Sequence, residues 1–270
     1  MNRLLTPILV ILVLLALNIF YYYKTWQATM IAQDLSIQST QQTTDANPIL
    51  GNDSTIQKQD TVSIKIKSNL KLEAYFRDQG LEYFSDSLNY SLVALGYADA
   101  QNEFNENFYD GLNKCFLRKE AVEKLQAACK LLKEKHPEYR LLIYDCARPQ
   151  SVQEKMYEKV KGTPQQSYVA SPKTVSLHSL GLAVDVTLIS SSTEQELDMG
   201  SAIDDLSILS DPSYEEHFLK LGRLSKKQVQ NRNILLEIME ETGWKRLSTE
   251  WWHFNALQSS EAKKKYKPIL

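Results

Sequence analysis

The first two dozen residues form an apolar stretch. From Leu4 to Tyr23 the sequence is interrupted only by Thr6, Pro7 and Asn18, and about 20 apolar residues suffice to cross a bilayer. A cleaved signal peptide is the alternative, but its apolar core usually spans about 7–15 residues and ends in small residues. This stretch ends instead in consecutive aromatic residues, which are typical of a membrane interface. We therefore expect residues 1–24 to form a membrane anchor rather than a cleaved signal segment.

The segment that follows is polar. Residues 25–60 are rich in Gln, Ser, Thr and Asp and have no sustained apolar periodicity, so they cannot bury enough surface to fold. We expect a flexible linker here. Arg3 and the amino terminus precede the apolar stretch, whereas Lys24 alone follows it before Lys58, which favours an amino terminus in the cytoplasm. The rest of the chain would then lie outside the cytoplasm, or be secreted if the first segment is cleaved.

Residues 61–270 have the patterns of a folded domain. Apolar residues alternate from Val62 to Ile66, which predicts a strand. Between Val122 and Leu132 apolar residues recur at helical spacing, and the apolar and aromatic run Tyr139–Tyr144 predicts a strand. The sequence therefore predicts a helix that leads into a strand.

Two more helices are predicted from their start signals. Pro149 suits the first turn of a helix whose apolar face runs from Val152 to Val160. Ser225 and Gln228 resemble a capping box for a helix that ends near Gly243. No βαβ rhythm and no glycine-rich phosphate loop appear in the sequence, which argues against a nucleotide-binding doubly wound fold.

Composition narrows the class of protein. The 270 residues, 43% hydrophobic and 24% charged, suffice for one sizeable domain with extensions. A formal charge of −2 with interspersed signs provides no broad basic surface and argues against nucleic acid as a partner. Cys115, Cys129 and Cys146 form no CxxC pair, and an odd number leaves at least one unpaired. We interpret them as small buried residues, and the sequence does not decide whether two of them form a disulfide.

Two of the four histidines lie in the most unusual local sequences, SLHSLGLAVD at 176–185 and EWWH at 250–253. The alternating apolar residues after Gly181 predict a strand with Asp185 on the face opposite to them. Gly181 would allow the chain to bend before that strand. His178 and Asp185 can then converge on one point, as a metal site requires.

His178, Asp185 and His253 together form a candidate zinc site with three protein ligands and a fourth position for water, the arrangement of a catalytic site. Glu250 would remain free to accept a proton from that water and to pass it to the leaving amine. In a regular strand Glu250 and His253 would point apart, so this role requires a turn or bulge between them. The alternative is a core histidine that is only hydrogen-bonded, and an aspartate paired with an arginine.

Further motifs accompany these two segments. In chain order, the set is Tyr97-Ala98, the Asn107–Gly111 stretch, Cys115-Phe-Leu-Arg118, Tyr144-Asp145-Cys-Ala-Arg148-Pro149, Ser176-x-His178-x-x-Gly181-x-Ala183-x-Asp185, Met199-Gly200-Ser201-x-x-Asp204, Gln230-Asn231-Arg232 and Glu250-Trp-Trp-His253-Phe. Across most of residues 90–257 the sequence thereby resembles the VanX-type D-alanyl-D-alanine dipeptidases. These belong to a zinc peptidase family that also contains the VanY-type D,D-carboxypeptidases.

The resemblance implies a fold and a set of residue roles. The fold would be an α+β domain with a small, mainly antiparallel sheet flanked by helices and a zinc site in a cleft on the sheet. Residues 61–270 would form this catalytic domain, preceded by the membrane helix. His178, Asp185 and His253 would bind one Zn²⁺, and Glu250 would be the catalytic acid and base, in agreement with the assignment from the residues themselves.

The resemblance also implies residues that bind the substrate, D-alanyl-D-alanine. Arg148 would stabilise the oxyanion that develops on the scissile carbonyl, and Ser176 would line the pocket. Asp204 would pair with the free amino group of the dipeptide. A longer substrate carries no charge there and would leave Asp204 unpaired, which would explain a preference for dipeptides.

The sequence also departs from the family. Cys146-Ala147 stands where Gly-Tyr is common before the arginine, and the region near Asn105 lacks its usual glycine. VanX acts on cytoplasmic dipeptide in glycopeptide resistance, whereas the predicted anchor would place this domain outside, where we expect it to act in cell-wall peptide turnover or nutrient recovery. The alternatives are a D,D-carboxypeptidase that trims peptidoglycan stem peptides and a non-catalytic hedgehog-like binding module.

Overall fold

The computed structural model describes residues 70–98 and 100–270. The predicted anchor of residues 1–24, the predicted linker of residues 25–60 and the strand expected from Val62 to Ile66 lie outside these described residues. Within them, no helix combines the length and the apolar character needed to span a bilayer. Residues 70–78 are helical and precede the first strand.

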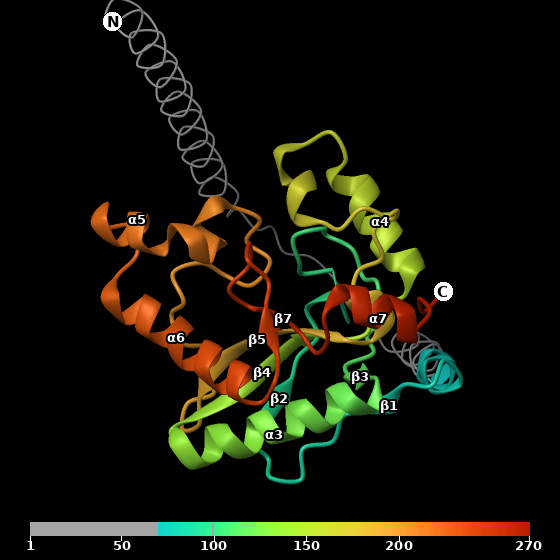
Figure 1. The fold of residues 1–270 in the computed structure, drawn as a ribbon, viewed down its shortest axis with the longest axis horizontal. Helices are drawn as coiled ribbons and strands as arrows, with labels where there is room; N and C mark the ends of the chain where they lie inside the picture. Colours follow the sequence, from blue (N-terminus) through green and yellow to red (C-terminus); the bar gives the residue numbers. More distant parts are fainter. Residues whose placement is uncertain (1–69, 99) are drawn as a thin grey trace, which may run out of the picture. The chain divides into compact units, whose positions relative to one another are not determined.

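A five-stranded sheet forms the centre of the domain (Figure 1). The pair β2–β4 is parallel and the other three pairs are antiparallel, which confirms the predicted α+β class and the mainly antiparallel sheet. In sheet order the strands are β2 (Ser91–Val93), β4 (Tyr139–Asp145), β5 (Ala183–Ser190), β7 (His253–Asn255) and β6 (Lys245–Arg246). A separate small sheet pairs β1 (Glu82–Tyr83) with β3 (Phe116–Leu117).

The two longest strands, β4 and β5, run antiparallel through the middle of this sheet. Ile143 lies opposite Val186, and both are buried in the hydrophobic core. The register then shifts, so that Asp145 becomes the partner of Asp185. The predicted strand Tyr139–Tyr144 is confirmed and extends one residue further. The shift brings two carboxylates to the same end of neighbouring strands, where like charges repel unless a cation lies between them.

Two long helices pack against the core strands. Helix α3 (Lys119–Lys135) and helix α6 (Lys226–Glu241) contact each other and also contact β4 and β5, respectively. The Ser225 side chain accepts a hydrogen bond from the Gln228 backbone, and the Gln228 side chain bonds back to Ser225. This is the predicted capping box, and the helix ends just before Gly243.

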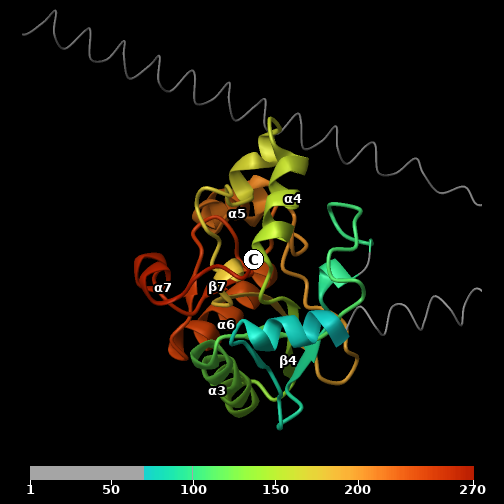
Figure 2. The same cartoon turned by 90° about the vertical axis from the view of Figure 1, so that its right-hand side faces the viewer.

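The other helices connect these elements. Helix α4 (Gln150–Val160) begins after Pro149 and buries Val152 and Met156, as predicted. Figures 1 and 2 both show α4 and α5 (Glu215–Lys220) on the side of the sheet away from α3. The remaining short helices are η1 (Gly96–Ala98), η2 (Pro164–Tyr168), η3 (His178–Leu180), η4 (Ile208–Ser210), η5 (Pro212–Tyr214) and α7 (Ser259–Lys265).

The three cysteines are all buried, as the sequence predicted. Cys115, just before β3, forms a disulfide with Cys146, just after β4. Cys129 lies in α3 with a free thiol. The disulfide therefore joins the small sheet to the end of β4, one residue after Asp145 and two before Arg148.

Candidate active site

His178 lies in η3 and is turned toward the sheet by the residues that follow it. Gly181 has a φ of +72°, a left-handed conformation that favours glycine. A Cβ at this position would lie 2.5 Å from Leu81 Cδ2, so no larger residue fits without movement. The Gly181 N–H donates to the His178 carbonyl at 2.9 Å and closes the turn that leads into β5. The bend that the sequence predicted is present.

Sheet register places the other two candidate ligands side by side. Asp185 of β5 is the direct partner of His253 of β7 in their antiparallel pair, and side chains of opposite residues on one face of a sheet lie close together. His253 Nδ1 is 3.0 Å from Asp185 Oδ1, and His178 Nε2 is 3.2 Å from Asp185 Oδ2. The two imidazole nitrogens are 3.1 Å apart.

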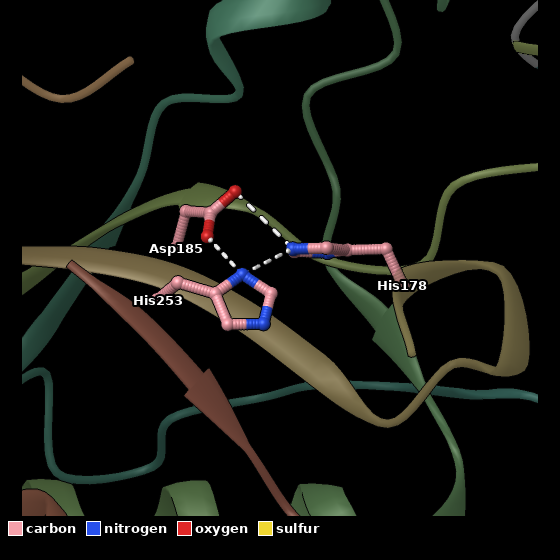
Figure 3. A group of neighbouring side chains, drawn as sticks. All are labelled: His178, Asp185 and His253. Carbon is pink, nitrogen blue, oxygen red and sulfur yellow. Dashed lines mark hydrogen bonds and ion pairs between the residues drawn. The ribbon is translucent and has the colours of Figure 1, made fainter. Parts of the chain in front are cut away.

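Figure 3 shows His178, Asp185 and His253 pointing toward one common point from three separate segments. Their ligand atoms all lie within 4.8 Å of one another, and all three residues are buried. Burial opposes the charge of Asp185, but the two imidazoles hold the pKa of this carboxyl below its ordinary value. Two imidazoles and one carboxylate, converging in this way, fit the donor set of a catalytic zinc site.

The outward nitrogen of each imidazole has a defined partner. His178 Nδ1 lies 2.6 Å from the Cys146 carbonyl oxygen, which can only accept. His253 Nε2 lies 3.0 Å from Asn255 Oδ1. If both outward nitrogens carry the proton and donate it, His178 Nε2 and His253 Nδ1 keep their lone pairs for a metal.

Glu250 lies beside the three candidate ligands. The chain bends at Trp251 and Trp252 before β7 begins, so Glu250 Oε2 comes within 3.9 Å of His253 Nδ1. The turn that the proposed role required is therefore present. Burial raises the pKa of Glu250 to about 8, with help from the negative charges of Asp185 and Asp204 and against the opposing effect of His253.

Arg148 is buried and held by several partners. Its Nε and Nη2 donate to Asp145 Oδ2 at 3.0 and 2.5 Å, and its Nη1 donates to Gln153 Oε1 at 2.9 Å. Asp145 also accepts from Tyr109 at 2.8 Å. Nη2 of Arg148 is 3.7 Å from Asp185, so this guanidinium is the cation that separates the two carboxylates at the end of β4 and β5.

Asp204 lies on the loop after β5 with a φ of +62°. The Tyr97 hydroxyl donates to Asp204 Oδ2 at 2.6 Å, and the Arg148 guanidinium lies 5.1 Å from the centre of the Tyr97 ring. Burial, together with the charge of Asp185, raises the pKa of Asp204 to about 7, although the Tyr97 hydrogen bond opposes the rise. A buried carboxylate with one neutral donor can still accept a cationic partner.

All seven predicted site residues line one cavity of about 300 Å³, at the small end of the range for ligand pockets. They are Ser176, His178, Asp185, Asp204, Arg148, Glu250 and His253. The Ser176 hydroxyl accepts a hydrogen bond from the His178 N–H at 3.3 Å. Apolar and aromatic walls include Phe104, Tyr168, Val169 and Leu206.

Four residues that hold this set in place, Asp145, Tyr97, Tyr109 and Gln153, were not predicted from the sequence. Tyr97, Tyr109 and Asp145 all lie in motifs that carry the family resemblance, but no role was predicted for them. A carboxylate three residues before Arg148 was a usable signal for Asp145. Gln153 has no such signal, because only the fold shows that its side chain accepts from Arg148.

Comparison with known proteins agrees with this geometry. Residues 88–268 match the peptidase M15 family model, described as D-Ala-D-Ala dipeptidase. A D-alanyl-D-alanine dipeptidase of Escherichia coli strain K12 is 30% identical, over 62% of this chain and 80% of the relative. The enzyme of that name from Synechocystis is 29% identical, over 54% of this chain and 71% of the relative. A D-alanyl-D-alanine dipeptidase from Enterococcus faecium is 33% identical, over 43% of this chain and 61% of the relative. The chain therefore belongs to the peptidase M15 family, as the resemblance predicted, and is a peptidase.

Proposed function

We propose that this protein is a zinc-dependent dipeptidase that hydrolyses D-alanyl-D-alanine to two molecules of D-alanine. The observation that carries the proposal is one small cavity in which the buried residues His178, Asp185 and His253 converge beside two further buried carboxylates, Glu250 and Asp204. The names of the relatives point to the same substrate.

His178 Nε2, Asp185 and His253 Nδ1 would hold the metal. Their two nitrogens and one carboxylate match the ligand preference of zinc. A zinc ion bound there supplies a Lewis acid that polarises the scissile carbonyl and makes water more acidic.

Glu250 would carry the proton. It lies beside His253 without a direct hydrogen bond to it at 3.9 Å, and its raised pKa, about 8, suits a group that both accepts and returns a proton near neutral pH. In hydrolysis of the peptide, Glu250 takes one proton from the attacking water. It then delivers that proton to the nitrogen of the departing D-alanine.

Arg148 would stabilise the negative charge that develops on the carbonyl oxygen. Three of its nitrogens are already engaged by Asp145 and Gln153, so the guanidinium is oriented before the substrate arrives. Preorganised charge of this kind costs no rearrangement during the reaction, which is why such groups contribute strongly to catalysis.

Asp204 would select dipeptides. An ammonium group in the substrate would pair with this buried carboxylate, whereas the amide nitrogen of a longer peptide at the same place would leave the carboxylate unpaired. The position of Tyr97, which donates to Asp204, leaves the other carboxylate oxygen for that ammonium.

A place outside the cytoplasm is part of the proposal. The predicted anchor supports it, and so does the Cys115–Cys146 disulfide, because disulfides persist mainly in oxidising compartments. We propose a role there in the turnover of cell-wall peptides.

The deciding experiment measures amine release by the zinc-loaded protein from D-alanyl-D-alanine and from a pentapeptide that ends in D-alanyl-D-alanine. Cleavage of the dipeptide alone is the expected result. Preferential cleavage of the pentapeptide would reassign the protein as a D,D-carboxypeptidase and remove the role of Asp204. No cleavage of either, despite bound zinc, would favour a binding module.

A further inference from the structure

The cavity has a second polar edge that the residues discussed so far do not use. Asn255, Ser259 and Lys263 follow one another at intervals of four residues, from the end of β7 into α7, and all three line the cavity. Figure 1 shows α7 directly after β7 along the chain, beside the strand that carries His253. This edge contains hydrogen-bond donors and no carboxylate, whereas Asp204 and Glu250 line the cavity elsewhere.

Lys263 is the cation on this edge, and it has no ionic partner among the described residues. The other arginine or lysine lining the cavity is Arg148, whose guanidinium is engaged by Asp145 and Gln153. Within the described part of the chain, no ion pair or hydrogen bond involves the Lys263 ammonium, and the residue is exposed. Its neighbour Lys265, by contrast, pairs with Glu120 at 2.6 Å.

Asn255 offers a donor as well. Its Oδ1 lies 3.0 Å from His253 Nε2, and a proton on Nε2 requires the amide oxygen to face the imidazole. The Nδ2 group of Asn255 must then face away from His253, and among the described residues no hydrogen bond uses it. Metal binding through His253 Nδ1 would therefore fix this amide group with its donor side available.

We propose that Lys263 and the Asn255 amide bind the terminal carboxylate of the substrate. The inference rests on the proposed function and deepens it, because a dipeptide has an ammonium group and a carboxylate on either side of its one peptide bond. Asp204 would take the first and Lys263 the second. The substrates are therefore peptides with a free carboxylate one residue beyond the bond that is cleaved, and an amide or an extension at that end is rejected.

The test compares Lys263→Met with Lys263→Arg and with the matched control Lys264→Met, which changes the neighbouring exposed lysine that does not line the cavity. Each zinc-loaded protein is assayed on D-alanyl-D-alanine and on its terminal amide. Loss of a charged contact is expected to lower kcat/KM for the free acid about tenfold in Lys263→Met, mainly through KM. The preference for the acid over the amide should shrink by the same factor. Lys263→Arg and Lys264→Met should keep that preference.

Asn255→Asp provides a second test, because it keeps an acceptor for His253 Nε2 and removes the donor. The expected result is retained zinc, measured by metal analysis, with a raised KM for the free acid. An acid-to-amide preference that stays unchanged in both Lys263→Met and Asn255→Asp would overturn the proposal. If the native protein cleaves the pentapeptide rather than the dipeptide, the same comparison with the pentapeptide and its amide tests this edge independently of the proposed dipeptidase function.

Discussion

The cavity has a floor and walls that are built differently. The floor consists of the buried residues His178, Asp185 and His253. In each pair of these residues the closest nitrogen or oxygen atoms lie within 3.2 Å of each other. The register of β5 with β7 and the turn at Gly181 bring them together. The walls come from segments outside the sheet, such as the loop that carries Asp204 and the exposed Lys263 of α7.

This difference separates chemistry from specificity. Strand pairing fixes Asp185 and His253 relative to each other, and a site built on strands is held more precisely than one built on loops. Loops and short helices can change in length and composition without disturbing the sheet. Glu250 and Arg148 lie outside the sheet but directly beside the floor, at 3.9 Å from His253 and 3.7 Å from Asp185. We therefore expect changes in the floor or in these two groups to abolish or strongly slow the reaction, and changes in the walls to alter which substrate is accepted.

The largest effect is expected at Glu250. Glu250→Gln keeps the shape of the side chain but cannot accept a proton, so kcat should fall by roughly a thousandfold. Amine release from D-alanyl-D-alanine measures this, and metal analysis should show unchanged zinc. A variant that keeps a tenth of the native kcat would exclude Glu250 as the acid and base.

Arg148→Lys should have the next largest effect. Lysine keeps the charge but cannot reproduce the planar fork that binds Asp145 and Gln153. We expect kcat to fall about a hundredfold, which is the scale for losing one oxyanion donor, with a smaller change in KM. An unchanged kcat with a raised KM would instead make Arg148 a binding residue.

The same contrast explains what the sequence could predict. The ligands of the floor stand in short motifs, and their convergence required only a bend at Gly181 and an antiparallel partner for Asp185. The network around Asp145 could not be predicted, because it depends on the register shift after Ile143 and on Tyr109, which is distant in sequence. Lys263 is one of three consecutive lysines, so no pattern distinguished it before the fold placed it at the cavity.

Asp204 should contribute to the acid side of the pH profile of kcat/KM, in addition to Glu250, which must be ionised to accept a proton. The pKa of Asp204 is raised to about 7 in the free protein, so it becomes neutral as the pH falls through this value and can no longer pair with an ammonium group. The part of the decline in kcat/KM for the dipeptide that is due to Asp204 is expected below about pH 7. This part should be smaller in kcat, because the bound ammonium keeps Asp204 ionised.

Tyr97→Phe is the matched control for this prediction. Its hydroxyl donates to Asp204 and lowers the pKa of that carboxyl, so removing it should move the acid limb of kcat/KM to higher pH. Asp204→Asn should remove the part of the acid-side decline in kcat/KM that comes from protonation of Asp204. It should also reduce the preference for dipeptides over longer peptides. Glu250 titrates in the native protein, in Tyr97→Phe and in Asp204→Asn alike. Only the difference between their pH profiles of kcat/KM therefore reports on Asp204.

The smallest effect on activity is expected from the disulfide. Cys115 and Cys146 close a loop with a separation of 31 residues, and such a crosslink contributes on the order of 3 kcal/mol to the free energy of unfolding. The Cys146 contact with His178 uses the backbone carbonyl, which a serine keeps. Cys115→Ser with Cys146→Ser should therefore lower stability in urea unfolding by about that amount while zinc-saturated kcat changes little. A reductant should bring the native protein to the stability of the double variant and leave that variant unchanged. A double variant that folds but no longer holds zinc would show instead that the crosslink is needed to position His178.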